Sequence, residues 1–78
     1  MAKVNFYAAA KAAAGLATLD IPANTLGSLI DELSALNPEL AKLLPTCSYL
    51  LNSESCEDLG QLLAEGDSID VLPQFAGG

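Results

Sequence analysis

The 78-residue sequence has no histidine, no tryptophan and no arginine, and its only basic residues are Lys3, Lys11 and Lys42. Without histidine it lacks the side chain that most often serves as a general base near neutral pH, and no nucleophile–base pair is evident. Cys47 and Cys56 are too few for a closed four-ligand zinc site or a four-thiolate iron–sulfur cluster within one chain. We therefore expect no bound metal, and thiols that stay reduced in the cytosol.

Positive charge is scarce overall: ten acidic residues against three basic ones give a formal net charge of −7. Phosphate backbones and anionic lipids repel such a chain, which argues against binding to nucleic acid or to a membrane surface. The apolar runs are too short to span a bilayer, and no basic segment followed by an apolar stretch opens the sequence. We expect a cytoplasmic protein.

Hydrophobic residues make up 51% of the sequence, which favours one folded domain over disorder. Because aromatic residues are few, the core must be mainly aliphatic. We expect it to be supplied by Leu16, Leu26, Leu29, Ile30, Leu33, Leu36, Leu40, Leu43, Leu44, Leu50 and Leu51.

Apolar spacing predicts the secondary structure. Alternation predicts a first strand over 3–7, with Val4 and Phe6 on one face, and alanine richness predicts a short helix over 8–14 that ends at Gly15. The main helix is predicted from Leu26 to Leu36, with Asn24 or Thr25 as its N-cap. The other expected elements are a strand over 16–21, a helix over 38–44 capped by Asn37 and ended by Pro45, a strand over 48–52, a turn over 52–55, a helical or 3₁₀ turn over 56–63, a turn over 65–68 and a last strand over 69–72.

This order predicts an α+β domain with a mixed β-sheet and one main helix packed on one face. Pro73 cannot donate to a strand ladder, so pairing should stop there. We expect a domain over residues 1–73 and a flexible tail over 74–78. The tail ends in Phe75-Ala76-Gly77-Gly78, a narrow stalk for a free carboxylate, although an ordinary frayed terminus has the same composition.

Four segments form a recognisable pattern: Val4–Ala8 with Lys11–Gly15, Thr25–Leu29, Asn52, and Glu65–Gly78. The last is the most specific, because an acidic-glycine turn, an apolar strand, Leu72-Pro73 and Gly77-Gly78 follow one another in order. Together the segments resemble the MoaD-type sulfur carriers, the small subunits of molybdopterin synthase, within the ubiquitin-like β-grasp superfamily. Two positions depart from that family: Gln74 stands where a second proline is common, and Lys11-Ala12 where an Arg-Glu pair is common.

The resemblance implies a role for each residue at the end of the chain. The Gly78 carboxylate would be adenylated by an ATP-using, ubiquitin-activating-type enzyme and converted to a thiocarboxylate by a persulfide donor. It would then give sulfur to a pterin precursor in the synthase large subunit, which supplies the catalytic residues, so the chain itself would be a non-catalytic subunit with no bound cofactor. Gly77 and Ala76 would pass through a narrow channel, and the partner contacts would be Phe75, Pro73 and Lys11.

Other interpretations stay open at this point. Phe75 can instead fold back onto the domain's own core, Pro73 can simply end the strand, and Lys11 can be a solvated side chain. The acidic residues Glu54, Glu57, Asp58, Glu65 and Asp67 form either a partner-facing surface or a solvated rim.

Different functions are also compatible with parts of the pattern. Carriers for thiamin, cysteine or tRNA thiolation share the terminal glycines, as do ubiquitin-like protein modifiers. An acyl-carrier protein is a further alternative, because Asp67-Ser68 resembles its modified serine site. This hypothesis requires the chain to fold as a helical bundle.

Overall fold

The structure, a computed structural model, describes residues 1–73. Its elements in chain order are β1 (Ala2–Phe6), α1 (Ala8–Ala14), β2 (Thr18–Ile21), α2 (Leu26–Leu36), α3 (Pro38–Leu43), the 3₁₀ turn η1 (Leu44–Thr46), β3 (Cys47–Leu51), β4 (Glu54–Ser55) and β5 (Ser68–Pro73).

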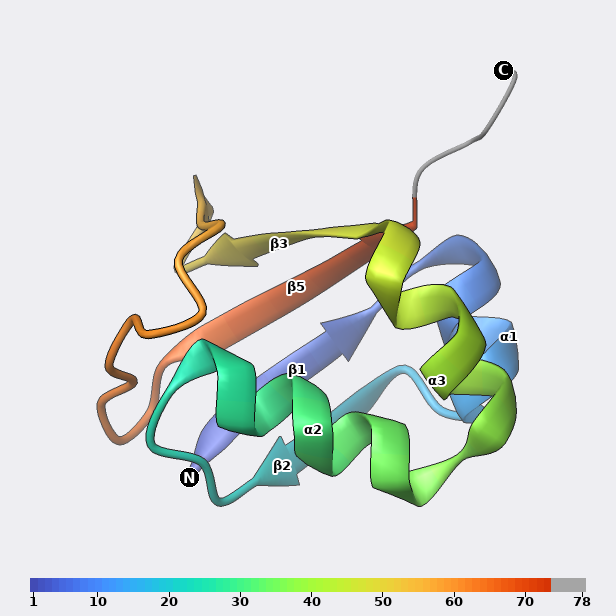
Figure 1. The fold of residues 1–78 in the computed structure, drawn as a ribbon, viewed down its shortest axis with the longest axis horizontal. Coiled ribbons are helices and arrows are strands. Elements are labelled where there is room, and N and C mark those ends of the chain that lie inside the picture. Colours follow the sequence, from blue (N-terminus) through green and yellow to red (C-terminus); the bar gives the residue numbers. More distant parts are fainter. Residues whose placement is uncertain (74–78) are drawn as a thin grey trace.

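The strands form one mixed sheet in the order β2-β1-β5-β3-β4. The last strand in sequence lies at its centre: β5 runs parallel to β1 and antiparallel to β3 (Figure 1). This confirms the predicted α+β fold with a mixed sheet. It excludes the acyl-carrier alternative, because Ser68 opens a strand and the chain is not a helical bundle.

The core lies between the sheet and the helices that cross one of its faces (Figure 1). Alternate residues of β1 and β5 point to this face, so Val4, Ile69 and Val71 are fully buried, as is Leu29 of α2. The buried residues are Ala2, Val4, Phe6, Ala10, Ile21, Leu26, Leu29, Leu33, Leu40, Leu44, Ile69 and Val71. Two expected core residues are exposed, Leu16 at 41% and Leu36 at 60%, since they lie in the turn before β2 and at the last position of α2.

Side chains cap the helices where the sequence predicted. Thr25 is the N-cap of α2: its Oγ1 accepts from the Ser28 N–H at 3.1 Å, and Ser28 Oγ accepts from the Thr25 N–H. Asn37 caps α3 through Oδ1 and also donates from Nδ2 to the Ala13 carbonyl at 2.8 Å, which joins α3 to α1. Gly15 has φ 77° at the end of α1, a left-handed conformation that favours glycine. Pro45 does not end the helical path, because it lies inside η1.

Residues 56–63 do not form the predicted helical turn. They run as an irregular loop whose carbonyls accept hydrogen bonds from the first N–H groups of α2: Leu26 donates to Gln61 at 3.0 Å and Gly27 to Leu59 at 2.8 Å. Helix N-termini leave such donors without intrahelical partners. The loop therefore takes the conformation that satisfies α2, and its leucines are not arranged on a helical face.

The predicted turn over 52–55 is shorter in the structure, because Glu54 and Ser55 already pair with β3. Asn52 and Ser53 have φ values of 48° and 73°, and two consecutive left-handed residues make a tight hairpin turn. Asparagine tolerates this conformation better than most residues.

Asn52 also links two distant turns. Its Nδ2 donates to Asp67 Oδ1 at 3.0 Å, and its Oδ1 accepts from the Ser68 N–H at 2.9 Å. Asp67 Oδ2 accepts from the Ala64 N–H at 2.7 Å. These hydrogen bonds to Asp67, first from Ala64 and then from Asn52, lower the pKa of its carboxyl group. The hairpin after β3 is thus tied to the turn that starts β5.

None of the helices within residues 1–73 has the length and apolar character needed to cross a membrane.

The hydrogen bonds that Asp67 accepts from Ala64 and from Asn52 predict a pH-dependent contribution to stability. Because the folded-state pKa of Asp67 is depressed, its contribution is present above the unfolded pKa and is lost as pH falls below about 4. We expect the Asp67→Asn variant to lose less stability than wild type between pH 6 and pH 3, measured by urea unfolding. The exposed Asp31→Asn variant on α2 is the control and should follow wild type. Equal losses in wild type and Asp67→Asn would contradict the link.

Gly27 permits the loop to approach α2. A Cβ at this position would stand 3.0 Å from the Leu59 carbonyl oxygen, so Gly27→Val should push the loop outward. We expect a loss of about 2 kcal/mol in the free energy of unfolding, and faster hydrogen exchange at residue 27. Ala35→Val, at an exposed α2 position, should cost only the weaker helix propensity, below about 1 kcal/mol. Equal losses of unfolding free energy in the two variants would show that close approach of the loop does not depend on Gly27.

Candidate functional site

The candidate site is the end of the sheet at which Pro73 lies. Pro73 is the last described residue of β5, and residues 74–78 follow it in the sequence. β1 and β5 are parallel, with Phe6 opposite Val71, so both strands finish at this end. β3 begins there, with Cys47 opposite Pro73. Pro73 is half-buried and is the last residue that the structure describes, so the prediction that strand pairing stops there stays untested.

Helix α1 forms one side of this end. It follows β1 directly and packs against β5 and α3, with Ala10 fully buried. Ala8 has φ 51°, a left-handed conformation that costs a residue with a Cβ about 1–2 kcal/mol. The sharp turn leaves Tyr7 46% exposed. Lys11 is exposed and takes part in neither of the ion pairs found among residues 1–73, Met1–Glu65 and Lys42–Glu39.

The 3₁₀ turn η1 forms the other side and is fastened to β3 by side chains. Tyr49 donates from its hydroxyl to the Leu44 carbonyl at 2.9 Å, and the Cys47 thiol donates to the Leu43 carbonyl at 3.3 Å. Burial raises the pKa of the Cys47 thiol. Burial, and secondly the neighbouring Cys47, raise the pKa of Tyr49 well above its usual value. Both groups stay protonated at neutral pH and act as structural donors, so Cys47 is not an activated thiolate.

The open face of the sheet carries a polar link between β1 and β5. Asn5 Nδ2 donates to Ser68 Oγ and to Asp70 Oδ1, both at 2.9 Å. These bonds add side-chain pairing to the parallel strands and fix β5 against its neighbour. Sequence alternation placed Asn5 on the polar face but gave no indication of its partners.

The structure brings Pro73 and Lys11 to the same end of the sheet. The other predicted site residues, Phe75, Ala76, Gly77 and Gly78, lie outside the described residues. Within residues 1–73, the cysteine and acidic side chains form no group of three or more placed to hold a metal ion. The described part of the site is therefore this end of the sheet with Pro73 and Lys11, where the Cys47 thiol is a protonated structural donor.

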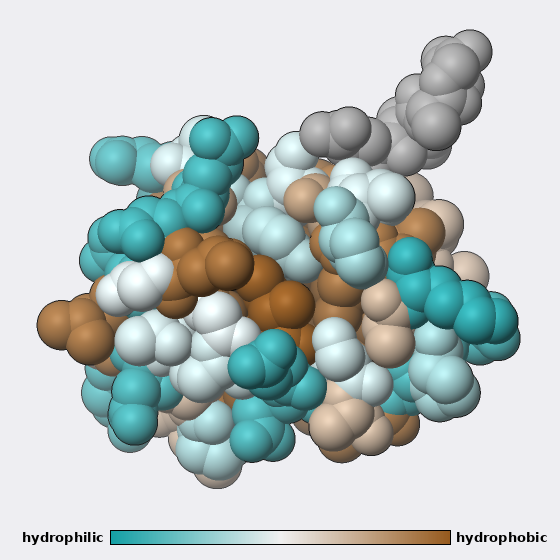
Figure 2. Space-filling model, viewed as in Figure 1, coloured by the Kyte–Doolittle hydropathy of each residue, from teal (hydrophilic) through white to brown (hydrophobic). Residues whose placement is uncertain are grey.

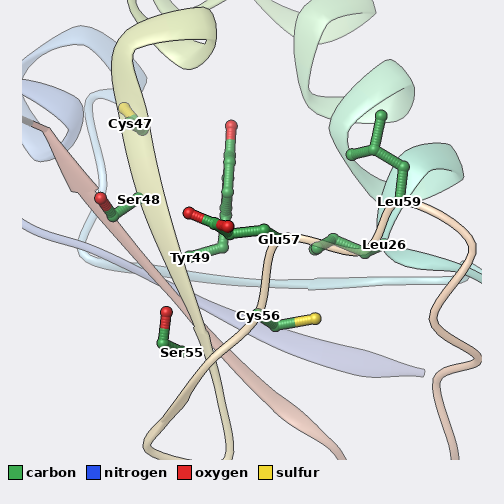
Figure 3. Close-up of a pocket in the computed structure, with 8 residues that line it drawn as sticks. All are labelled: Leu26, Cys47, Ser48, Tyr49, Ser55, Cys56, Glu57 and Leu59. Atoms are coloured by element: carbon green, nitrogen blue, oxygen red, sulfur yellow. The ribbon is translucent and has the colours of Figure 1, made fainter.

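A second feature was not predicted from the sequence. A groove of about 260 Å³ opens between β3, the segment after β4, and the start of α2. Figure 3 shows its lining residues on both sides of the opening: Cys47, Ser48, Tyr49, Ser55, Cys56 and Glu57 on one, Leu26 and Leu59 on the other. The one feature of the sequence that could have indicated this groove is Gly27. Because Gly27 has no side chain, the loop that carries Leu59 can approach α2.

Comparison with known proteins assigns the family. The ThiS family model matches residues 4–78, nearly the whole chain. No curated protein sequence matches the chain.

Solved structures with the same fold cover almost the full length. A chain of the complex of subunits 1 and 2 of molybdopterin-converting factor from Helicobacter pylori is 30% identical, with a TM-score of 0.78 over 99% of this chain and 97% of that one. SAMP1 from Haloferax volcanii is 25% identical, with a TM-score of 0.80 over 99% and 98%. The small archaeal modifier protein 1 from Methanosarcina acetivorans, 23% identical, gives a TM-score of 0.89 over 99% and 95% and shows the fold alone.

The central position of β5, the helix-covered mixed sheet and the match over residues 4–78 agree with one another. They confirm the resemblance to sulfur carriers that the sequence suggested. The chain belongs to the ThiS family of ubiquitin-like β-grasp sulfur carriers.

Proposed function

We propose that the chain carries sulfur in molybdopterin synthesis, as a thiocarboxylate on Gly78 that is donated to a pterin precursor. The observation that carries the proposal is the position of β5. This strand is held between β1 and β3 as far as Pro73, and the family match continues through Gly78. A fixed strand end followed by a narrow glycine terminus suits delivery of a main-chain carboxylate into a partner's active site.

The length of residues 74–78 limits where a partner can bind. Even fully extended, they place Gly78 no more than about 18 Å from Pro73. An enzyme that acts on Gly78 must therefore approach the end of the sheet formed by α1, η1 and the start of β3. We propose Pro73 and exposed Lys11 as partner contacts on this basis, with Phe75 as an apolar anchor.

The chemistry requires activation of the carboxylate, since oxygen is a poor leaving group. An adenylyltransferase would couple the Gly78 carboxylate to AMP from ATP, releasing pyrophosphate. A persulfide sulfur would displace AMP to give an acyl persulfide, and a thiol would cleave its S–S bond, leaving the thiocarboxylate and a disulfide. All catalytic groups come from other proteins, in keeping with a chain that has no histidine.

The proposed acceptor is the large subunit of molybdopterin synthase, whose active site would receive Gly78. The similarity to a chain of the Helicobacter pylori complex supports this partner, because that structure joins subunits 1 and 2 of molybdopterin-converting factor. Gly77 and Ala76 would occupy the channel that leads to the pterin precursor. A Cβ at Gly77 would obstruct a channel fitted to glycine.

Protein modification is the second candidate function. It is favoured by the similarity to SAMP1 from Haloferax volcanii, which is 25% identical. Both functions begin with the same acyl-adenylate and differ in the acceptor, which is sulfur for a carrier and a lysine amine for a modifier. Carriers for thiamin, cysteine or tRNA thiolation share the first steps and differ in the final acceptor.

Intact-mass spectrometry tests the proposal. The full chain is incubated with its adenylyltransferase, ATP and a persulfide donor, and then with the large subunit and the pterin precursor. We expect one C-terminal oxygen to be replaced by sulfur in the first stage and restored in the second. Gly77→Val should slow the second stage at least about tenfold, while Ala76→Gly, which removes a Cβ, should deliver sulfur normally.

Each contrary result points to a different error. An adenylate that never gains sulfur would rule out the carrier role. A thiocarboxylate that the large subunit does not consume would exclude the molybdopterin branch and leave the other sulfur pathways. Isopeptide-linked conjugates in place of a thiocarboxylate would establish the modifier function.

A further inference from the structure

The loop over residues 56–63 is firmly held yet exposes two large apolar side chains. Leu59 is 60% exposed and Leu62 is 72% exposed. The loop is fixed through its backbone: Gly27 donates to Leu59 at 2.8 Å, and Leu63 donates to the Asn24 carbonyl at 2.8 Å. Because main-chain bonds hold the loop, the Leu59 side chain is left at the surface in a defined position.

Leu59 forms one wall of the groove beside β3. Leu26, only 1% exposed, lies on the same side, and Tyr49 and Cys56 lie opposite (Figure 3). Figure 2 shows apolar surface gathered in this hollow, between the loop and the start of α2, with hydrophilic side chains along its border. At about 260 Å³ the groove can accept one or two apolar side chains of another protein.

The border of the groove is negatively charged. Glu57 lines it, and the exposed Glu54 and Asp58 lie close to it in the chain. The lysines of residues 1–73 lie on other elements: Lys3 on β1, Lys11 on α1 and Lys42 on α3, where it pairs with Glu39. A groove of mixed lining, with apolar side chains from Leu26 and Leu59 beside an acidic border, is complementary to an apolar side chain flanked by basic ones.

The groove also adjoins the proposed partner-binding end. Cys47 lines the groove and pairs with Pro73, the last residue that the structure describes. A protein bound at that end of the sheet can therefore reach the groove without crossing the domain. By contrast, the apolar hollow formed by Phe6, Ala14, Leu16, Leu19, Leu36 and Leu40 has no charged residue in its lining.

We propose that this groove docks a short segment of a partner protein, in which an aliphatic or aromatic side chain is flanked by lysine or arginine. The apolar side chain packs against Leu26, Leu59 and Cys56, and the basic residues face Glu57 and its acidic neighbours. The inference goes beyond sulfur transfer and holds whichever acceptor Gly78 serves.

Titration of the ¹⁵N-labelled full chain with short acetylated peptides tests the docking site. The probes carry a central leucine or phenylalanine flanked by lysines; matched peptides carry a central serine, or glutamates in place of the lysines. We expect shifts at residues 26, 47–49 and 55–59 with the basic apolar peptides only. Leu59→Ser should weaken binding about tenfold, and Glu57→Lys about fivefold with a reduced salt dependence.

Leu62→Ser is the matched control, because Leu62 is an exposed leucine on the same loop that does not line the groove. This variant should bind within about twofold of wild type. The proposal is overturned if no basic apolar peptide shifts the groove at millimolar concentration, or if Leu59→Ser binds like Leu62→Ser. Shifts centred on Leu16 and Leu36 would place the docking site in the other hollow and would also overturn it.

Discussion

The pairing of β5 with β1 on one side and β3 on the other is the constraint on which the rest of the structure depends. Residues from opposite ends of the sequence meet here, with Val4 opposite Ile69 and Phe6 opposite Val71, and β3 pairs with the other side of β5. Ile69 and Val71 are fully buried, and Asn5 adds side-chain hydrogen bonds to Ser68 and Asp70. Since the last strand is the central one, the position of Pro73, the last described residue, is fixed by the whole fold.

A second constraint is the exchange of hydrogen bonds between α2 and the loop over residues 56–63. The N-terminus of α2 has more backbone donors than the Thr25–Ser28 capping box can satisfy, and the loop carbonyls accept from Leu26 and Gly27. The same contacts set the position of Leu59 and thereby shape the groove. Helix capping, loop conformation and the shape of the groove thus have one physical origin.

The sequence predicted the features that depend on local chemistry. Alternation in β1, the spacing of leucines in α2, the Thr25 and Asn37 caps and the left-handed Gly15 all follow from short-range rules, and the structure confirms them. The predictions that the structure contradicts depend on contacts between residues far apart in the sequence. Residues 56–63 have a composition typical of a helix, but their carbonyls accept hydrogen bonds from the first N–H groups of α2 and so hold the segment as a loop. Leu36 has the spacing of the buried leucines of α2, but it is exposed because it is the last residue of that helix.

In the candidate site, too, some features were predicted from the sequence and others were not. Pro73 and Lys11 were identified from the sequence and lie at one end of the sheet, while the groove around Leu26 and Leu59 depends on a tertiary contact that spacing does not reveal. Phe75, Ala76, Gly77 and Gly78 remain predictions, because they lie outside the described residues.

In the proposed function, residues 1–73 form the structural base and the reactive group lies beyond them. Shortening the chain to residues 1–73 tests this most directly, with urea unfolding and thiocarboxylate formation measured on the same preparation. We predict a free energy of unfolding within about 0.5 kcal/mol of the full chain and complete loss of thiocarboxylate formation. Unfolding of the shortened chain, or sulfur uptake by it, would contradict the account.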